Sequence, residues 1–113
     1  MERGVIVLTK FPFTDLSATK RRPALVLSPD NPVDPDVIVA FISSIVPVSP
    51  GQTDFVLDAS HPDFAATGLS KTSVFKMDKL ATLDKAIFTG ELGEVSATIY
   101  VELKARLRLA LDL

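Results

Sequence analysis

Three consecutive cations, Lys20, Arg21 and Arg22, stand directly before a short apolar run that begins with Pro23. A guanidinium presents a planar fork of N–H donors that matches the oxygens of a phosphate group. Because proline drives the residue before it into an extended backbone, Pro23 should fix the direction of Arg22 where the strand begins. We therefore expect an anion-binding site here, although cations in this position also serve as solvated residues that keep a strand edge from pairing.

Hydroxyl groups and a pair of opposite charges occur near two other apolar runs. Ser43 and Ser44 directly follow the run at 37–42, where hydroxyl groups either face a cleft or form a turn. Lys76 and Asp78 are two residues apart, so their side chains share one face of an extended chain. Such a pair can act as an acid and a base, or it can form a surface salt bridge worth ~0–1 kcal/mol.

The other chemical candidates are a histidine and an aromatic pair. His61 is the only histidine, and its turn-rich surroundings predict an exposed loop residue, with proton shuttling as the alternative. Phe11 and Phe13 flank a proline. Phe13 can stack on a nucleotide base or pack at the end of a strand.

The composition limits the class of protein. The chain has 113 residues, enough for a single domain over 1–113 with a core of its own. It has no cysteine and one histidine, which excludes disulfides and cysteine-based zinc sites, and we expect no metal cofactor. The first residues lack an apolar signal segment, and no apolar run approaches the ~20 residues that span a bilayer. We therefore expect a cytoplasmic protein with no membrane partner.

Charge is distributed unevenly along the chain, although the net charge is only −2. Residues 1–28 carry five Lys/Arg and two acidic residues, for a net +3, whereas residues 29–69 carry six acidic residues and no Lys or Arg. Residues 70–113 carry seven Lys/Arg and six acidic residues. This asymmetry predicts that an anion-binding face draws its residues from the two ends of the chain.

Short β-branched and aromatic runs predict a mainly β protein. The expected strands are 5–8, 24–27, 37–42, 55–57, 73–76 and 86–88. Turn-forming residues predict loops at 30–36, 46–51 and 58–72, and a connection at 78–85. The run at 37–42 does not alternate, so we expect it to be covered on both faces by a curled sheet, a helix or a second copy.

The last part of the chain changes to a helical period. Apolar residues recur every four positions from Val95 to Leu111, with Gly93 as a candidate cap and basic residues toward the end. Five to seven short strands followed by one helix predict a small, strongly curved barrel with the helix packed on it.

Together these segments resemble the MazF/PemK family, the toxins of bacterial and archaeal toxin–antitoxin pairs. The two most specific segments are Lys-Arg-Arg-Pro-Ala-Leu-Val-Leu at 20–27 and Asp-Lys-Leu-Ala-Thr-Leu-Asp at 78–84. The resemblance is spread over most of the chain, and its other matches are Arg3-Gly4, Phe-Pro-Phe-Thr-Asp-Leu at 11–16, Ile42-Ser43-Ser44, Gly68-Leu69-Ser70, Ser73-Val74, Gly90 and Leu92.

The resemblance implies a small SH3-like β-barrel with a C-terminal helix that forms a homodimer. It also implies metal-independent endoribonuclease cleavage of single-stranded RNA, often mRNA, at short sequence motifs. An acidic antitoxin tail is expected to neutralise the toxin by lying in the RNA groove.

The resemblance further assigns roles to individual residues. Arg22 matches the catalytic arginine before the proline and would stabilise charge on the phosphorane. Ser43 matches the hydroxyl residue after the central strand, and Lys76 and Asp78 match an Arg-x-Asp pair. Asp78 is then the candidate base and Lys76 the candidate for electrostatic help or leaving-group protonation, while Lys20, Arg21, Phe13 and Ser44 are expected to contact RNA.

The sequence departs from the family pattern at several positions. Serine replaces the more usual threonine at Ser43, lysine replaces arginine at Lys76, Val5 stands where an aspartate is common, and 14–20 contain no histidine. The departures at Val5 and Lys76 keep open a non-catalytic protein that acts by binding a protein, as the gyrase-poisoning CcdB toxins of the same fold do, or a degenerate family member that retains antitoxin binding without cleavage. A third alternative is a dimeric barrel without toxicity. The run at 37–42 and the apolar helix stripe favour a homodimer in each case.

Overall fold

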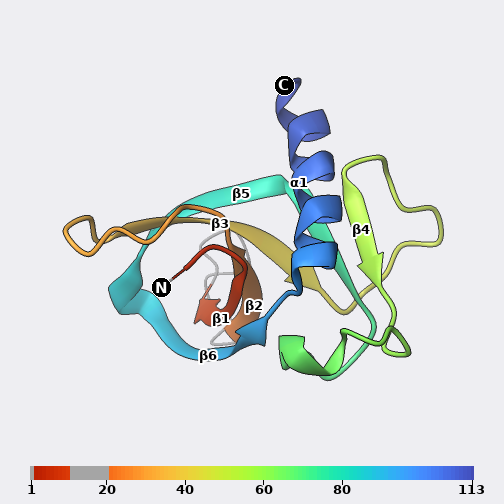
Figure 1. Ribbon diagram of the computed structural model, residues 1–113, viewed down its shortest axis with the longest axis horizontal. Coiled ribbons are helices and arrows are strands. Elements are labelled where there is room, and N and C mark those ends of the chain that lie inside the picture. Colours follow the sequence, from red (N-terminus) through yellow and green to blue (C-terminus); the bar gives the residue numbers. More distant parts are fainter. Residues whose placement is uncertain (1, 11–20) are drawn as a thin grey trace.

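The computed structural model describes residues 2–10 and 21–113 (Figure 1). Two predicted RNA contacts, Phe13 and Lys20, lie outside the described residues. Within those residues the chain forms one six-stranded sheet, two short 3₁₀ turns and one α-helix. The elements in chain order are β1 (Val5–Lys10), β2 (Arg21–Val26), β3 (Asp36–Ser43), β4 (Asp54–Leu57), η1 (Ala65–Thr67), β5 (Ser73–Asp84), η2 (Lys85–Ile87), β6 (Phe88–Glu94) and α1 (Ala97–Leu111).

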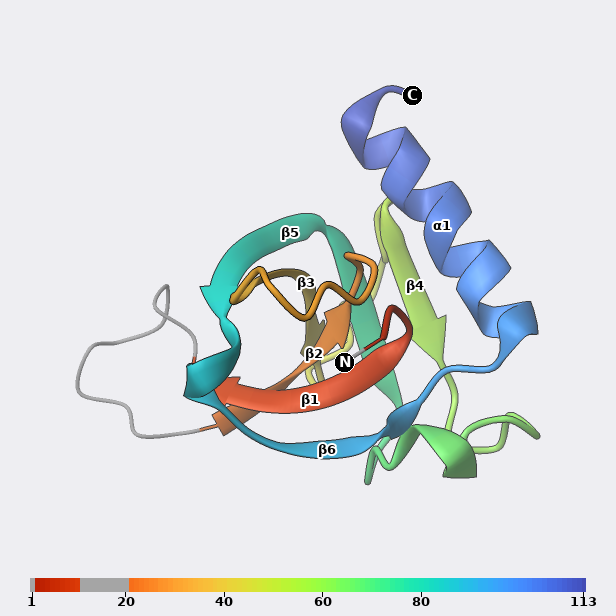
Figure 2. The same cartoon turned by 60° about the vertical axis from the view of Figure 1, so that its left-hand side comes forward.

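The sheet is antiparallel throughout, with the strand order β4-β5-β3-β2-β1-β6. It curls strongly, and the chain passes from β5 through η2 to β6 on the other side of the curl (Figure 2). In the part of the chain that the structure describes, β4 and β6 end the sheet and are not paired with each other, so the barrel is open. The expected mainly β fold with a terminal helix is confirmed.

Each face of the sheet carries a buried hydrophobic cluster, because alternate residues of a strand point to opposite faces. The larger cluster includes Ile99 and Leu103 of α1, which pack with residues from five of the strands. The smaller cluster lies on the other face and consists of Val7, Ala24, Val26, Val37, Val39 and Leu83. The run at 37–42 is therefore covered within a single chain, with the exception of Ile38, which is 42% exposed.

The prediction for β5 was wrong, because one strand replaces the expected strand at 73–76 and the connection at 78–85. β5 pairs with β3 on both sides of an irregularity: Phe41 lies opposite Lys76, whereas Ala40 lies opposite Leu80. The three residues 77–79 are thus inserted between two paired stretches, and they include the exposed charges that suggested a loop. Such a bulge bends a strand without ending it.

The turn between β5 and β6 also differs from the prediction, which placed a strand at 86–88. Residues 85–87 form η2, and the Asp84 side chain accepts a hydrogen bond from the Ala86 N–H at 2.9 Å. An aspartate in this position stabilises a turn rather than a strand. Strand β6 then begins at Phe88.

The predicted C-terminal helix is confirmed, but its cap is not Gly93. Ser96 is the N-cap, and its side chain accepts a hydrogen bond from the Ile99 N–H at 3.2 Å. The apolar stripe is buried at Ile99 and Leu103, whereas Leu111 is 50% exposed. The last turns of α1 extend beyond the sheet (Figure 2). No helix among the described residues is long and apolar enough to cross a membrane.

Candidate functional site

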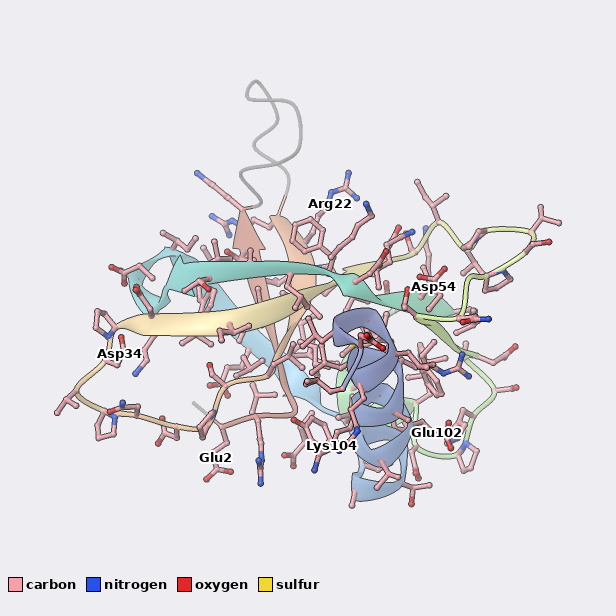
Figure 3. The ribbon with its side chains drawn as sticks, turned by 90° about the horizontal axis from the view of Figure 1, so that it is seen from above. Glu2, Arg22, Asp34, Asp54, Glu102 and Lys104 are labelled. Atoms are coloured by element: carbon pink, nitrogen blue, oxygen red, sulfur yellow. The ribbon has the colours of Figure 1, made fainter. Side chains whose placement is uncertain are left out.

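A cleft of about 430 Å³ opens where β2 begins. Arg21, Arg22 and Ser44, which the sequence nominated for RNA contact or catalysis, all line it. Its other lining residues come from β1, the end of β3, the start of β5, the segment 68–71 and β6. Figure 3 shows Arg22 on the side of the sheet that lies away from the labelled helix residues Glu102 and Lys104.

Strand pairing holds the arginines in place. Arg22 lies opposite Thr9 of β1, and Arg21 lies opposite Lys10. Thr9 is fully buried, Arg22 is half-buried and Arg21 is exposed. Much of the cleft wall beside these cations is apolar and consists of Leu8, Pro23, Ile42, Leu69 and Leu92. A cleft with apolar walls and a few charged groups is typical of a ligand site.

The register also relates the arginines to the charged residues of β5. Ala24, Phe41 and Lys76 form one row across β2, β3 and β5, because Ala24 pairs with Phe41 and Phe41 pairs with Lys76. Arg22 lies on the same face as this row, two residues from Ala24. Ideal sheet spacings put the Arg22 and Lys76 Cα atoms about 12 Å apart.

Ser43 ends β3 at the level of Arg22. Continuing the β2–β3 register by two residues beyond Ala24 and Phe41 aligns Arg22 with Ser43. The Ser43 Oγ accepts a hydrogen bond from the Ile45 N–H at 3.1 Å, so it forms the turn that the sequence offered as the alternative. Its own hydroxyl proton can still be donated to a bound oxygen. Ser43 does not line the cleft itself, whereas Ser44 does.

Asp78 and Lys76 lie outside the cleft that holds the arginines. Asp78 is exposed and lines a second hollow of about 330 Å³ together with Phe41, Lys79 and Leu80. Lys76 is half-buried and pairs with Phe41 on one side and with Asp54 on the other. The four predicted catalytic residues are therefore not gathered in one cavity; they are distributed around Phe41 over three neighbouring strands.

Two residues beside this arrangement were missed in the sequence. Lys71 lines the cleft with the two arginines, and Asp54 lies opposite Lys76. The signal for Lys71 was its position directly after the Gly68-Leu69-Ser70 segment. Nothing in the sequence indicated Asp54, because only the β4–β5 register brings it next to Lys76.

The last candidates are the single histidine, His61, and the acidic residues that could bind a metal ion. His61 lies in a loop as predicted but is half-buried, and its Nδ1 accepts a hydrogen bond from the Asp63 N–H at 3.0 Å. It does not line the cleft at β2. Among residues 2–10 and 21–113, no group of three or more His, Asp or Glu side chains is placed to hold a metal ion.

Comparison with known protein families identifies the family of the chain. Residues 2–111 match the model of the "PemK-like, MazF-like toxin of type II toxin–antitoxin system". The chain belongs to this family. Among curated proteins, no sequence matches this member of the PemK/MazF family.

Solved structures of PemK/MazF-type proteins have the same fold. An endoribonuclease in complex with its cognate antitoxin from a Mycobacterial species has a TM-score of 0.78 at 21% identity, covering 100% of this chain and 96% of that one. The MazE–MazF complex of Deinococcus radiodurans has a TM-score of 0.76 at 27% identity, covering 100% and 97%. The Mycobacterium tuberculosis toxin MazF-mt6 has a TM-score of 0.75 at 24% identity, covering 96% and 97%.

Proposed function

We propose that this chain is the toxin of a type II toxin–antitoxin pair and cleaves single-stranded RNA as a metal-independent endoribonuclease. The family membership supports the toxin assignment, and similar structures are named endoribonucleases. The observation that carries the catalytic proposal is the cleft at β2. There Arg22 lies half-buried before Pro23, beside Arg21 and Ser44, so an RNA strand in the cleft would meet two guanidinium groups and a hydroxyl.

RNA carries its own nucleophile, the 2′-hydroxyl group, at each nucleotide. Attack of the 2′ oxygen on the adjacent phosphorus forms a 2′,3′-cyclic phosphate. The 5′ oxygen of the next nucleotide leaves with a proton as a 5′-hydroxyl. The protein must accept one proton, donate another and stabilise the negative charge of the phosphorane.

The residues around Phe41 can supply these functions. Arg22 stabilises the phosphorane, and Ser43 donates its hydroxyl proton to a non-bridging oxygen or orients the 2′-hydroxyl. Asp78 accepts the 2′ proton, and Lys76 assists electrostatically or protonates the leaving oxygen. Arg21 and Ser44 contact the RNA strand, and Lys20 and Phe13 are proposed to do so from outside the described residues.

The test is incubation of the purified protein with a long single-stranded RNA in EDTA. Discrete fragments that end in a cyclic phosphate and a 5′-hydroxyl are expected. Loss of one preorganised donor of this kind typically costs ~10²–10³ in rate, so Arg22→Ala should cleave at least a hundredfold more slowly. Arg108→Ala, at an exposed position in the last turn of α1, is the matched control and should cleave like the wild type. Full activity of Arg22→Ala with a native circular dichroism spectrum would refute the assignment.

The same experiment separates the enzyme from a binding protein. A non-catalytic toxin that acts like CcdB would leave the RNA intact at every protein concentration. The departures at Val5 and Lys76 favour this alternative, whereas the two arginines in one cleft favour cleavage. Intact RNA together with growth arrest on induction would establish the binding protein.

We further infer two protein partners. Similar structures are complexes of a toxin with an antitoxin, which supports a cognate antitoxin whose acidic segment occupies the cleft and excludes RNA. A homodimer is supported by exposed apolar residues of α1, since Val101 is 66% exposed and Leu109 is 58% exposed. Light scattering at micromolar concentration should give the mass of a dimer, and the mass of a monomer would refute it.

The chain is proposed to work as one toxin domain over 1–113 in the cytoplasm. An mRNA substrate is found there. Expression of a fluorescent fusion in a bacterium, with the toxin inactivated at Arg22, would show diffuse internal fluorescence. Membrane or periplasmic fluorescence would refute the localisation.

A further inference from the structure

Lys71 is a third cation of the cleft at β2. It is exposed, and it lines the same cavity as Arg21 and Arg22 although it lies about fifty residues further along the chain. It is also the first Lys or Arg after a stretch, residues 29–69, that carries six acidic residues and no basic one. Lys71 is therefore the first positive charge after this acidic stretch, and it lies in the same cleft as the two arginines of β2.

The backbone around Lys71 is held by hydrogen bonds. The hydroxyl of Ser73, which is 3% exposed, donates to the Lys71 carbonyl oxygen at 2.8 Å. Thr72 Oγ1 accepts a hydrogen bond from the Ala59 N–H at 2.8 Å. Buried Thr67 donates its hydroxyl to the Phe64 carbonyl oxygen at 2.6 Å and accepts from the Leu69 N–H at 3.2 Å. Hydrogen bonds therefore hold the backbone both before and after Lys71.

The residues just before Lys71 also pack closely against β6. Gly68 has a φ of +73°, and a Cβ atom added there would lie 2.1 Å from the Leu92 carbonyl oxygen. A Cβ added at Gly93 would lie 2.2 Å from the Ala66 carbonyl oxygen. No side chain fits between the two backbones. The segment that carries Lys71 therefore packs directly against β6, and Leu92 of β6 forms part of the cleft wall.

A cation on a fixed backbone suits a polyanion with regularly spaced charges. Single-stranded RNA carries one negative charge per nucleotide, so neighbouring phosphates need separate cations. Arg22 is occupied by the scissile phosphate in the proposed function, which leaves Arg21 and Lys71 for phosphates next to it. The apolar wall of the cleft, which includes Leu69 and Leu92, offers a surface for the nucleotide between these phosphates.

We propose that Lys71 binds a backbone phosphate adjoining the scissile one, and that the close packing of Gly68 against Leu92 and of Gly93 against Ala66 positions it. Lys71 is a substrate-binding residue and takes no part in proton transfer. This inference rests on the proposed function, because it requires RNA in the cleft. An acidic peptide carries the same sign of charge, but its carboxylates lack the sugar and base that the apolar wall would contact.

The experiment measures binding as a function of salt. The probe is a fluorescent 2′-O-methyl oligonucleotide that spans a mapped cleavage site, since it lacks the 2′-hydroxyl nucleophile and stays intact. Each phosphate contact on a single strand contributes about 0.7 to the slope of log K against log salt. Lys71→Ala should therefore lower that slope by about 0.7 and weaken binding about fourfold at 0.15 M salt, with the two proteins converging near 1 M.

Matched variants make the outcome specific. Lys71→Arg should keep the wild-type slope, because it keeps the charge. Lys104→Ala removes an exposed lysine from α1, away from Arg22 in Figure 3, and should also keep the slope. At saturating RNA the cleavage rate of Lys71→Ala should stay within about twofold of the wild type, since uniform binding loss raises KM and leaves kcat unchanged.

Each result decides the proposal. An unchanged salt slope for Lys71→Ala, in a preparation whose wild type cleaves RNA, refutes the role of Lys71 and leaves the proposed function intact. Weakened binding of a glutamate-rich peptide with unchanged RNA binding assigns the cation to an acidic protein partner and also refutes it. A wild type that neither cleaves nor binds RNA refutes the proposed function, and the inference with it.

Discussion

The contact between the η1 segment and β6 can be tested by adding a single methyl group. In Gly93→Ala the new Cβ would meet the Ala66 carbonyl oxygen at 2.2 Å and the Thr67 carbonyl carbon at 2.7 Å. Both are backbone atoms, which cannot rotate away as the end of a side chain can. The variant must therefore move η1 away from β6 or shift the strand itself.

The size of the effect follows from the cost of overpacking, which is typically about 1–3 kcal/mol. An unfolding entropy of about 2.1 cal/mol/K per residue gives about 0.24 kcal/mol/K for a chain of this length. Each kcal/mol then lowers the Tm by about 4 °C, so Gly93→Ala should unfold about 4–13 °C below the wild type.

Gly90→Ala is the matched control, since it makes the same substitution in the same strand. Nothing lies within 4 Å of a Cβ added at Gly90. Its Tm should equal or exceed that of the wild type, because replacing glycine by alanine at a compatible position stabilises by about 0.4–1 kcal/mol. Differential scanning calorimetry at one protein concentration measures all three proteins.

The same contact also bears on the cleft at β2. If Gly93→Ala displaces the segment 68–71, its RNA affinity below the unfolding temperature should fall together with the salt slope, as in Lys71→Ala. Equal Tm values for Gly93→Ala and Gly90→Ala would show that the two backbones are not in close contact, and the positioning of Lys71 would lose its basis.

Three further substitutions test the core, the helix cap and a loop. Leu103 is a fully buried residue of α1, so Leu103→Ala should destabilise the protein by about 2–5 kcal/mol in urea unfolding. A loss below about 1 kcal/mol would contradict the packing of α1 on the sheet. Ser96→Ala removes the acceptor for the Ile99 N–H and should cost about 0.5–2 kcal/mol in the same assay, whereas Ser96→Asp should retain most of the stability. Hydrogen bonds from the Ser60 N–H and then from its hydroxyl lower the pKa of Asp58 below its ordinary 3.8. Ser60→Ala should therefore raise that pKa in a carboxyl NMR titration. The lowered pKa stabilises the fold above pH 3.8, and this contribution is lost as the pH falls through the folded-state pKa. The difference in unfolding free energy between the wild type and Ser60→Ala should therefore be present at neutral pH and vanish in acid.

The sequence patterns predicted elements well where local chemistry and tertiary packing agree. The β-branched runs at β1 and β3 and the four-residue period of α1 all form the expected structures. They failed at β5, where exposed Asp78 and Lys79 resemble a loop. Pairing with β3 resumes on both sides of the irregularity at 77–79 and so continues the strand, and a long-range pairing of this kind leaves no local signal.

The candidate site was predictable where its residues are sequence neighbours. Arg21 and Arg22 are adjacent, and Pro23 signals their geometry. The grouping with Lys71 depends on a contact between η1 and β6 that no periodicity describes, although Gly68, one of the two glycines that permit it, belongs to the family segment Gly68-Leu69-Ser70. The position of Asp54 was even less predictable, because only the register of β4 on β5 brings it opposite Lys76.

That register bears on which carboxylate would accept the 2′ proton in the proposed reaction. Asp54 and Asp78 both adjoin Lys76, one across the sheet and one along the strand. The Asp54 carboxylate accepts the Gly51 N–H at 2.9 Å and closes the turn before β4, so protonating it would weaken a structural hydrogen bond. Asp78 is exposed at the irregularity of β5, beside the hollow at Phe41, and within the described residues no hydrogen bond holds its carboxylate. A base must gain and lose a proton without disturbing its surroundings, and this requirement favours Asp78 for the chemistry and Asp54 for holding β4 beside Lys76.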